Sequence, residues 1–230
     1  YVLLPNQTAI IEMASCAGLH LLTQSERDPS IATTYGVGEM LLDAIDKGAK
    51  HIILGIGGSA TNDAGTGMLK ALGYRFLDSQ HHELAQGGKA LAALAFIDSS
   101  GVSDKIADIS ITVACDVTNP LCGKLGASHV YAPQKGATLD DIVILDNALN
   151  HFANIARRQN FPDNRNEAGA GAAGGLGFAL MTFLPAKLTG GFQLVSKIIH
   201  LEQIIQEADL VITGEGKMDF QTSMSKVASG

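Results

Sequence analysis

The sequence lacks the marks of a metal-cage, nucleic-acid-binding or membrane protein. Its cysteines, Cys16, Cys115 and Cys122, form no Cys-x-x-Cys pair, so neither a zinc cage nor a disulfide framework is indicated. Acidic residues outnumber basic ones by 23 to 16, which argues against a nucleic-acid-binding surface. The most apolar stretch, around residues 177–184, is too short to span a bilayer. A reduced, cytoplasmic setting is the simplest expectation.

The charge balance also constrains any anionic substrate. With a net charge of -7, the protein must meet such a substrate with local cations, a metal ion or helix N-termini. Hydrophobic residues make up 46% of the chain and glycine occurs 26 times, a composition typical of a glycine-rich α/β enzyme. A chain of 230 residues can bury a substantial core as one large domain or two small ones.

Short apolar strands alternate with helical patterns along the chain. Residues 118–137, rich in glycine and proline, are expected to form one long ordered loop. Thr138 and Asp141 have the spacing of a capping box at the start of a helix. Thr33 or Thr34 is expected to cap a helix that stops at Gly48. Other helices are expected at 68–72, 172–184 and 201–207, and strands at 8–14, 52–54, 74–77 (entering a hairpin), 109–113 and 209–213. This order predicts a layered α/β fold, with a parallel or mixed sheet and flanking helices.

One strand runs through glycines into a helix and carries the strongest sign of a site. Residues 52–54 form an apolar strand, and Gly55, Gly57 and Gly58 follow directly. A helix start of this kind presents free backbone N–H groups and a dipole that favour an anion. The stretch lacks the Gly-Lys-Ser/Thr ending of a P-loop and the glycine spacing of a dinucleotide site. It also falls one residue short of the Gly-x-Ser-x-Gly elbow around Ser59. The polar run that comes next favours phosphate or carboxylate binding: Ser59, Thr61, Asn62 and Asp63.

Carboxylates follow three of the expected strands. They are Asp63, Asp116, and the pair Glu215 and Asp219. Ligand crevices of α/β sheets open at the carboxyl ends of strands, and Mg²⁺ usually takes one or two carboxylates. Asp63 could equally cap a helix, and Asp116 could be a turn residue before Asn119-Pro120. Glu215 lies between two glycines, where a ligand role is favoured.

Two lysines and a glycine run have ambiguous roles in the sequence. Lys217 shares the loop of Glu215 and can neutralise phosphate, but a lone lysine is more often plain surface. Lys135 carries the same ambiguity. The small residues at 169–177 favour close helix packing over phosphate binding.

Four ordered blocks resemble the glycerate kinase family that includes the bacterial glycerate 2-kinases. They are Gly-Ile-Gly-Gly-Ser-Ala-Thr-Asn-Asp-Ala-Gly-Thr-Gly-Met-Leu (55–69), Ala-Cys-Asp-Val-Thr-Asn-Pro-Leu (114–121), Gly-Ala-Gly-Ala-Ala-Gly-Gly-Leu-Gly (169–177) and Ile-Thr-Gly-Glu-Gly-Lys-Met-Asp-Phe-Gln-Thr (212–222). Residues 225–230 depart from the family's usual Gly-Lys-x-Pro-x-Gly helix start and keep Lys226 and the final glycine. The blocks span nearly the whole chain.

The resemblance implies an ATP-dependent kinase that phosphorylates glycerate, giving 2-phosphoglycerate, with Mg²⁺. It implies two α/β domains, one Rossmann-like, and an active site in the cleft between them. We expect residues 1–208 to belong to the non-Rossmann domain and residues 209–230 to begin the return into the Rossmann-like one. Because the chain begins with Tyr1 and family members carry further segments on both sides, it is expected to be truncated.

Roles within the site follow from the resemblance together with the chemistry of phosphoryl transfer. Asp116 or Asp219 is expected to orient the glycerate hydroxyl, and Asp63 or Glu215 to lie beside Mg²⁺. Glu215 is therefore expected among the catalytic as well as the metal-binding residues. The expected phosphate- and substrate-binding residues are Gly57, Gly58, Ser59, Thr61, Asn62 and Lys217.

Two other classes of function remain open from the sequence. A serine hydrolase using Ser59 would need a histidine and a carboxylate to converge on that hydroxyl. A non-catalytic protein that binds small carboxylates would bind glycerate without consuming ATP. A homo-oligomer is compatible with the sequence, and no nucleic-acid or membrane partner is expected.

Overall fold

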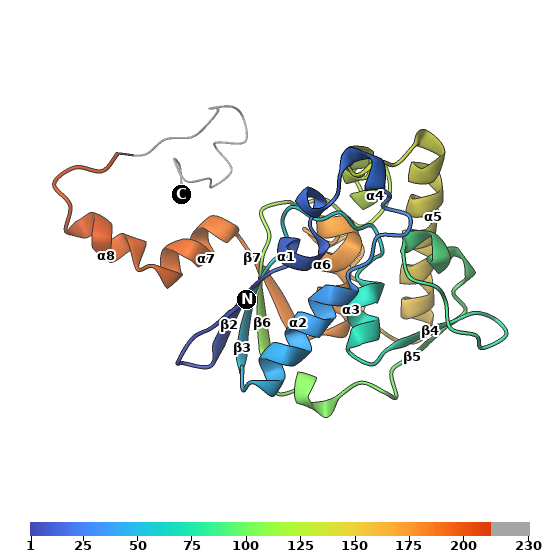
Figure 1. Cartoon of the computed structure of the whole chain (residues 1–230), viewed down its shortest axis with the longest axis horizontal. Helices are drawn as coiled ribbons and strands as arrows, with labels where there is room; N and C mark the ends of the chain where they lie inside the picture. The colour runs from blue at the N-terminus through green and yellow to red at the C-terminus, as the bar shows by residue number, and fades with distance from the viewer. Residues whose placement is uncertain (213–230) are drawn as a thin grey trace. The chain divides into compact units, whose positions relative to one another are not determined.

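The computed structural model describes residues 1–212, and its central element is a five-stranded sheet in the order β1-β2-β3-β6-β7 (Figure 1). Strands β2 (Thr8–Glu12), β3 (His51–Gly55) and β6 (Ser110–Ala114) are parallel neighbours. The short strand β1 (Val2–Leu3) is antiparallel to β2 at one edge, and β7 (Ala186–Thr189) forms the other edge. The expected parallel or mixed sheet with flanking helices is confirmed.

The register of the parallel strands explains which face of the sheet is buried. Alternate residues of the strands lie opposite one another and are buried, in two cross-strand rows: Ala9, Ile52 and Ile111, then Ile11, Leu54 and Val113. Side chains alternate between the faces of a strand, so these rows point to one face and pack into the main core. The carboxyl ends of all three parallel strands therefore lie on the same side of the sheet. The glycine-rich segment begins there, directly after β3.

Helices α2 (Tyr35–Asp46) and α3 (Thr66–Ala71) pack against each other. Thr34 is the N-cap residue of α2, and Gly48 follows the helix with φ of 95°. A residue in this left-handed conformation is a common helix ending, and glycine adopts it without steric cost. The expected helix and its stop are confirmed. Ahead of α2 lie the short helices α1 (Ala14–Ala17), η1 (Leu19–Leu21) and η2 (Gln24–Glu26).

Helix α5 (Leu139–Arg158) begins at the expected capping box. The Asp141 amide donates to Thr138 Oγ1 at 3.2 Å, and the Thr138 amide donates to Asp141 Oδ2 at 3.1 Å. Asp140 and Asp141 in the first turn and Arg157 and Arg158 in the last turn also complement the helix dipole. The buried stripe of α5 packs against the 3₁₀ helix η3 (Gly88–Ala93).

Two expectations for local structure were wrong or incomplete. Residues 118–137 are not one loop, because they contain helix α4 (Ala127–Tyr131) and the 3₁₀ helix η5 (Pro133–Lys135). Strand β4 (Arg75–Leu77) pairs with the distant β5 (Phe96–Asp98), with only a single bridge from Leu77 to Glu83 in the expected hairpin. A further 3₁₀ helix, η4 (Asp104–Ile106), precedes β6. The pairing of β4 with β5 depends on contacts between segments that are distant in the sequence.

The chain divides into two compact units, Tyr1–Leu188 and Thr189–Gly230. In the described part of the second unit lie α7 (Gly191–Ile198), which the sequence did not predict, and α8 (Leu201–Gln206), which it did. The strand expected at 209–213 is wrong for its described residues 209–212, which form no strand. A strand needs a neighbour for its backbone groups, and Leu210 and Ile212 are 76% and 87% exposed. The expected boundary between residues 208 and 209 stays a prediction.

Candidate functional site

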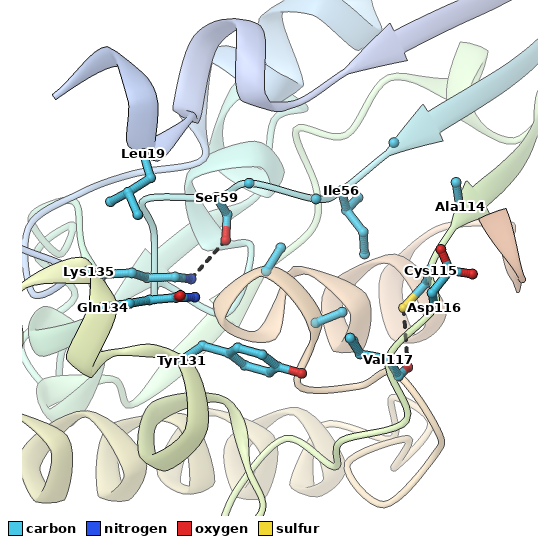
Figure 2. A pocket seen from close by; sticks show the side chains of 15 residues that line it. Leu19, Ile56, Ser59, Ala114, Cys115, Asp116, Val117, Tyr131, Gln134 and Lys135 are labelled. Carbon is cyan, nitrogen blue, oxygen red and sulfur yellow. Dashed lines mark hydrogen bonds between the residues drawn. The ribbon is translucent and has the colours of Figure 1, made fainter. Parts of the chain in front are cut away.

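A hollow of about 490 Å³ opens where β3 and β6 end (Figure 2). Its walls include residues 55–59 of the glycine turn (residues 55–62), the residues after β6, part of η5 and the start of α6 (Ala172–Phe183). We call it the strand-end hollow and define it by these lining residues: Leu19, Gly55, Ile56, Gly57, Gly58, Ser59, Ala114, Cys115, Asp116, Val117, Tyr131, Gln134, Lys135, Ala172 and Ala173. Its size lies in the usual range for small-molecule sites, and carboxyl strand ends are where α/β sheets bind ligands.

The glycine turn is held to the preceding segment by backbone hydrogen bonds. The Leu19 amide donates to the Gly58 carbonyl at 2.8 Å, and the Ala60 amide donates to the Ala17 carbonyl at 2.8 Å. Gly58 has φ of 69°, which favours glycine. Of the residues expected to bind phosphate or substrate, the structure places Gly57, Gly58 and Ser59 on the hollow.

Lys135 lies beneath this turn and is 2% exposed. Its Nζ donates to Ser59 Oγ at 2.8 Å and to the Thr61 carbonyl at 2.7 Å. Burial lowers the pKa of Lys135 to about 7, although the nearby Asp63 carboxylate acts in the opposite direction. From the sequence, Lys135 could be either a plain surface residue or a phosphate-binding residue of the site. No local pattern distinguishes it, because its burial comes from packing against residues about 75 positions earlier.

Asp63 is fully buried and does not line the hollow. Its carboxylate accepts hydrogen bonds from the Thr34 amide at 2.8 Å and the Thr34 hydroxyl at 2.9 Å. It also accepts from the Gly65 amide at 3.0 Å and the Gly67 amide at 3.2 Å. Burial raises the pKa of Asp63, and these donors oppose that shift. A carboxylate already bonded to four donors is placed to join α2 to α3, so the structure favours the helix-capping interpretation over the expected Mg²⁺ role.

Thr61 and Asn62 are also buried, at 1% and 0% exposed, and neither lines the strand-end hollow. Asn62 Nδ2 donates to Ser128 Oγ at 3.0 Å, which ties the turn to α4. The structure therefore does not bring Thr61 and Asn62 to the surface that the sequence predicted for them. Thr61 acts through its carbonyl, which holds Lys135.

The other side of the hollow is formed by the residues that follow β6 (Figure 2). Asp116 is exposed there, and in Figure 2 it lies across the hollow from Lys135. Cys115 is half-buried, and burial raises the pKa of its thiol, so it stays protonated near neutral pH, consistent with an unreactive residue. Tyr131 donates to Asn119 Oδ1 at 2.6 Å, and burial raises the pKa of its phenol.

The first turn of α6 departs from helical geometry where it meets the glycine turn. Ala173, Gly174 and Gly175 have φ of 51°, 68° and 91°. A Cβ on Gly174 would lie 2.1 Å from the Thr61 carbonyl oxygen, so only glycine allows this approach. The Ala64 amide donates to the Gly174 carbonyl at 3.0 Å. The interpretation of residues 169–177 as a close-packing segment agrees with this geometry.

Glu215, Lys217 and Asp219 lie outside the described residues. Within residues 1–212 no cluster of three or more His, Cys, Asp or Glu side chains could hold a metal ion. In the same range, no helix combines the length and apolarity needed to cross a membrane. No histidine lines the hollow in the described part of the chain, and the hydrogen-bond partner seen at Ser59 Oγ is Lys135. The arrangement required for a Ser59 hydrolase is therefore not observed.

The fold and the strand-end hollow define an α/β protein with a ligand site at the carboxyl ends of parallel strands. A sequence model of the glycerate kinase family matches residues 1–230, and the chain belongs to that family. It is 50% identical to the glycerate kinase of Bacillus subtilis (strain 168), over 98% of this chain and 59% of that protein. It is 48% identical to the glycerate 2-kinase of Escherichia coli (strain K12), again over 98% of this chain and 59% of that protein.

A solved structure agrees with the fold. The chain superposes with a TM-score of 0.85 on a crystal structure from Salmonella typhimurium LT2, provisionally assigned as glycerate kinase 2. The two share 50% identity, and the match covers 93% of this chain and 58% of that one. The chain thus spans about 59% of the length of the curated relatives it matches.

Proposed function

We propose that the whole protein transfers the γ-phosphoryl group of ATP to a hydroxyl of glycerate, and that the strand-end hollow forms part of the active site. The observation that carries this proposal is the convergence of the glycine turn, Asp116 and Lys135 on one hollow. Phosphoryl transfer depends mainly on positioning and on neutralising charge, and this hollow offers a cation, exposed glycine backbone and a carboxylate. The relatives named above support glycerate as the acceptor.

Each side of the hollow has a separate role in this proposal. Gly57 and Gly58 allow an anionic group to approach the backbone closely, and Ser59 offers a hydroxyl. Asp116 orients the glycerate hydroxyl and receives its proton. Lys217, Glu215 and Asp219, as the sequence predicts, add charge neutralisation and further carboxylates.

Mg²⁺ is part of the proposal through the chemistry of its donors. It retains several waters in most proteins and is held by one or two carboxylates, so Glu215, which the sequence predicts beside the ion, would be a sufficient protein ligand together with those waters. When bound, the ion neutralises phosphate charge. Asp63 is left out as a ligand because its oxygens are engaged with Thr34 and with the amides before and within α3.

The finer features of the family resemblance are proposals as well. We propose 2-phosphoglycerate as the product, two domains with one of them Rossmann-like, and a cytoplasmic setting that suits three free cysteines. We also propose that residues 1–208 belong to the non-Rossmann domain and that 209–230 begin the return to the other.

The test uses the whole protein and Asp116→Asn, with Asp46→Asn as the matched control. Asp46 is exposed and pairs with Lys105 at 2.6 Å, away from the lining of the hollow. We expect ATP-dependent turnover of glycerate to fall by about 10²–10⁴ in Asp116→Asn, the usual range for removing an acid–base group, and to stay unchanged in the control. Glu215→Gln tests the second carboxylate in the same assay.

Two results would overturn the proposal. Near-full activity in both Asp116→Asn and Glu215→Gln would remove the two carboxylates from the chemistry. Glycerate binding without ATP consumption by the wild-type protein would favour the non-catalytic carboxylate binder. NMR spectroscopy of the product distinguishes a phosphate on the 2-hydroxyl from one on the 3-hydroxyl.

A further inference from the structure

A buried lysine is unusual enough to need an explanation. Lysine is almost never fully buried unless it is paired, because removing its charge from water is costly. Lys135 is 2% exposed, and its Nζ is bonded to a neutral hydroxyl and a neutral carbonyl. Neither is a counter-ion, and the nearby Asp63 carboxylate offsets the desolvation of the charged amine only in part, since the pKa of Lys135 is still lowered.

The amine also retains unused bonding capacity. A protonated lysine has three N–H donors, and within the described residues hydrogen bonds account for two of them. Because Lys135 lines the strand-end hollow together with Ser59, a ligand in the hollow can approach both groups. The arrangement is that of a cation held ready for an anion.

We propose that Lys135 is the positioning cation of the strand-end hollow: its amine fixes the turn that carries Ser59 and provides the local positive charge that an anionic group of the substrate requires. This inference rests on the proposed function and adds a residue to it. It also answers the difficulty raised by the net charge of -7, because a protein with excess acid needs a dedicated cation where an anion binds.

The charge state of Lys135 then depends on what the hollow contains. Burial lowers the pKa of Lys135 to about 7, so the empty site holds a mixture of amine and ammonium near neutral pH. An anion beside the amine favours the charged form, so anion binding draws a proton from solvent. Other titratable groups border this site on the packed elements, namely Asp63, Asp116, Cys115 and Tyr131. Arg27 lies beside the end of η5, where its main chain and Cβ lie against Gly136.

Those neighbours do not produce the same signal. Asp63 carries four hydrogen bonds and lies outside the hollow, while Cys115 and Tyr131 have raised pKa values and stay neutral near pH 7. The lining residues of α6, Ala172 and Ala173, carry no titratable group. The loss of proton uptake in Lys135→Met therefore assigns the uptake at about pH 8 to Lys135.

The experiment compares the whole wild-type protein with Lys135→Met, which keeps a long, unbranched side chain and removes the charge. Lys124→Met is the control, because Lys124 is exposed and does not line the hollow. Glycerate is titrated calorimetrically at about pH 8 in two buffers of different ionisation enthalpy, which gives the number of protons taken up. We expect a fraction of a proton for the wild type and the control, and none for Lys135→Met.

Steady-state kinetics supply a second readout. We expect the KM for glycerate to rise about 10- to 100-fold in Lys135→Met, the loss typical of a hydrogen bond to a charged group. A purely structural role would lower the amount of folded enzyme without changing KM or proton uptake. Unchanged KM and unchanged uptake in a folded Lys135→Met would overturn the inference.

Two further outcomes are covered by the same design. If Lys135→Met does not fold, the wild type decides, because absence of proton uptake at about pH 8 contradicts the inference. If the wild type neither binds nor phosphorylates glycerate, the proposed function fails, and inorganic sulfate, which does not titrate near pH 8, replaces glycerate in the titration. Sulfate binding with proton uptake would then support Lys135 as the cation, and sulfate binding without uptake would contradict it.

Discussion

Two regions of the first unit are both densely packed but are held together by different physics. The aromatic cluster has Phe152 at its centre, with ring centroids 5.8 Å from Phe76, 5.8 Å from Phe178 and 5.7 Å from Phe183. The glycine corner joins the glycine turn, the adjoining Asp63, the start of α6 and Lys135. It contains almost no large side chains and is held by backbone approach, hydrogen bonds and two buried ionisable groups.

The difference shows how each region responds to change. The aromatic cluster depends on volume, so a substitution there should reduce stability according to the atoms removed. The glycine corner depends on close contact and charge, so one added carbon or one lost charge should matter more than lost volume. The architecture of the glycine corner suits an anion-binding site, because it brings backbone groups and a positive charge close to the ligand.

The largest effect is expected from Gly174→Ala in the glycine corner. The added Cβ would lie 2.1 Å from the Thr61 carbonyl oxygen, and the residue has φ of 68°. We expect a loss of more than about 5 kcal/mol in the free energy of unfolding, measured by urea denaturation. The matched control is Gly57→Ala, where a Cβ would meet nothing within 4 Å. Its stability should change by less than about 0.5 kcal/mol, and equal losses in the two variants would contradict the account.

In the aromatic cluster, Phe152→Ala should lower the free energy of unfolding by about 3–5 kcal/mol, because it leaves a cavity among the three remaining rings. The KM for glycerate of the folded fraction should not change. Phe152→Leu retains more of the volume and should lose less stability. A large change in KM with little loss of stability would mean that the two regions are not separate in function.

A pH-dependent effect, smaller within any one pH unit, is expected at Lys135. Its folded pKa of about 7 lies below the value of 10.5 for an exposed lysine, so between these values the unfolded chain binds more protons. The stability of the wild type relative to Lys135→Met should therefore rise with pH across this window, by at most about 1.4 kcal/mol per pH unit. Urea denaturation at several pH values measures the slope, and a flat or falling difference would contradict a lowered pKa.

The smallest effect concerns a cap outside both regions. Thr138→Ala removes the hydroxyl that accepts from the Asp141 amide, and we expect a loss of about 1 kcal/mol in the free energy of unfolding. Thr138→Ser keeps the hydroxyl and should retain most of the stability. Catalysis should be unaffected in both, and a change in kcat would show that α5 communicates with the hollow.

Local signals in the sequence predicted much of the scaffold. The apolar strands with glycine or acidic residues at their ends, and the capping box of α5, depend on residues close together in the chain. The stop of α2 at Gly48 is also local. The sequence likewise predicted that Gly57, Gly58, Ser59 and Asp116 share one hollow, because parallel strands end at the same edge.

The remaining features depend on contacts between distant segments. Lys135 is buried by a turn about 75 residues earlier, and Asp63 bonds to Thr34, the N-cap residue of α2. A polar residue after a strand can point into a cleft or be buried in the protein, and Thr61 and Asn62 are buried. Strand β7 and the pairing of β4 with β5 likewise follow from the tertiary arrangement rather than from local pattern.

The most direct measurement is a crystal structure of the whole protein with glycerate and a non-hydrolysable ATP analogue. We predict glycerate in the strand-end hollow, with its anionic group near Lys135 and Ser59 and a hydroxyl near Asp116. Glycerate bound elsewhere, with the hollow empty, would contradict the central claim that this strand-end hollow receives the substrate.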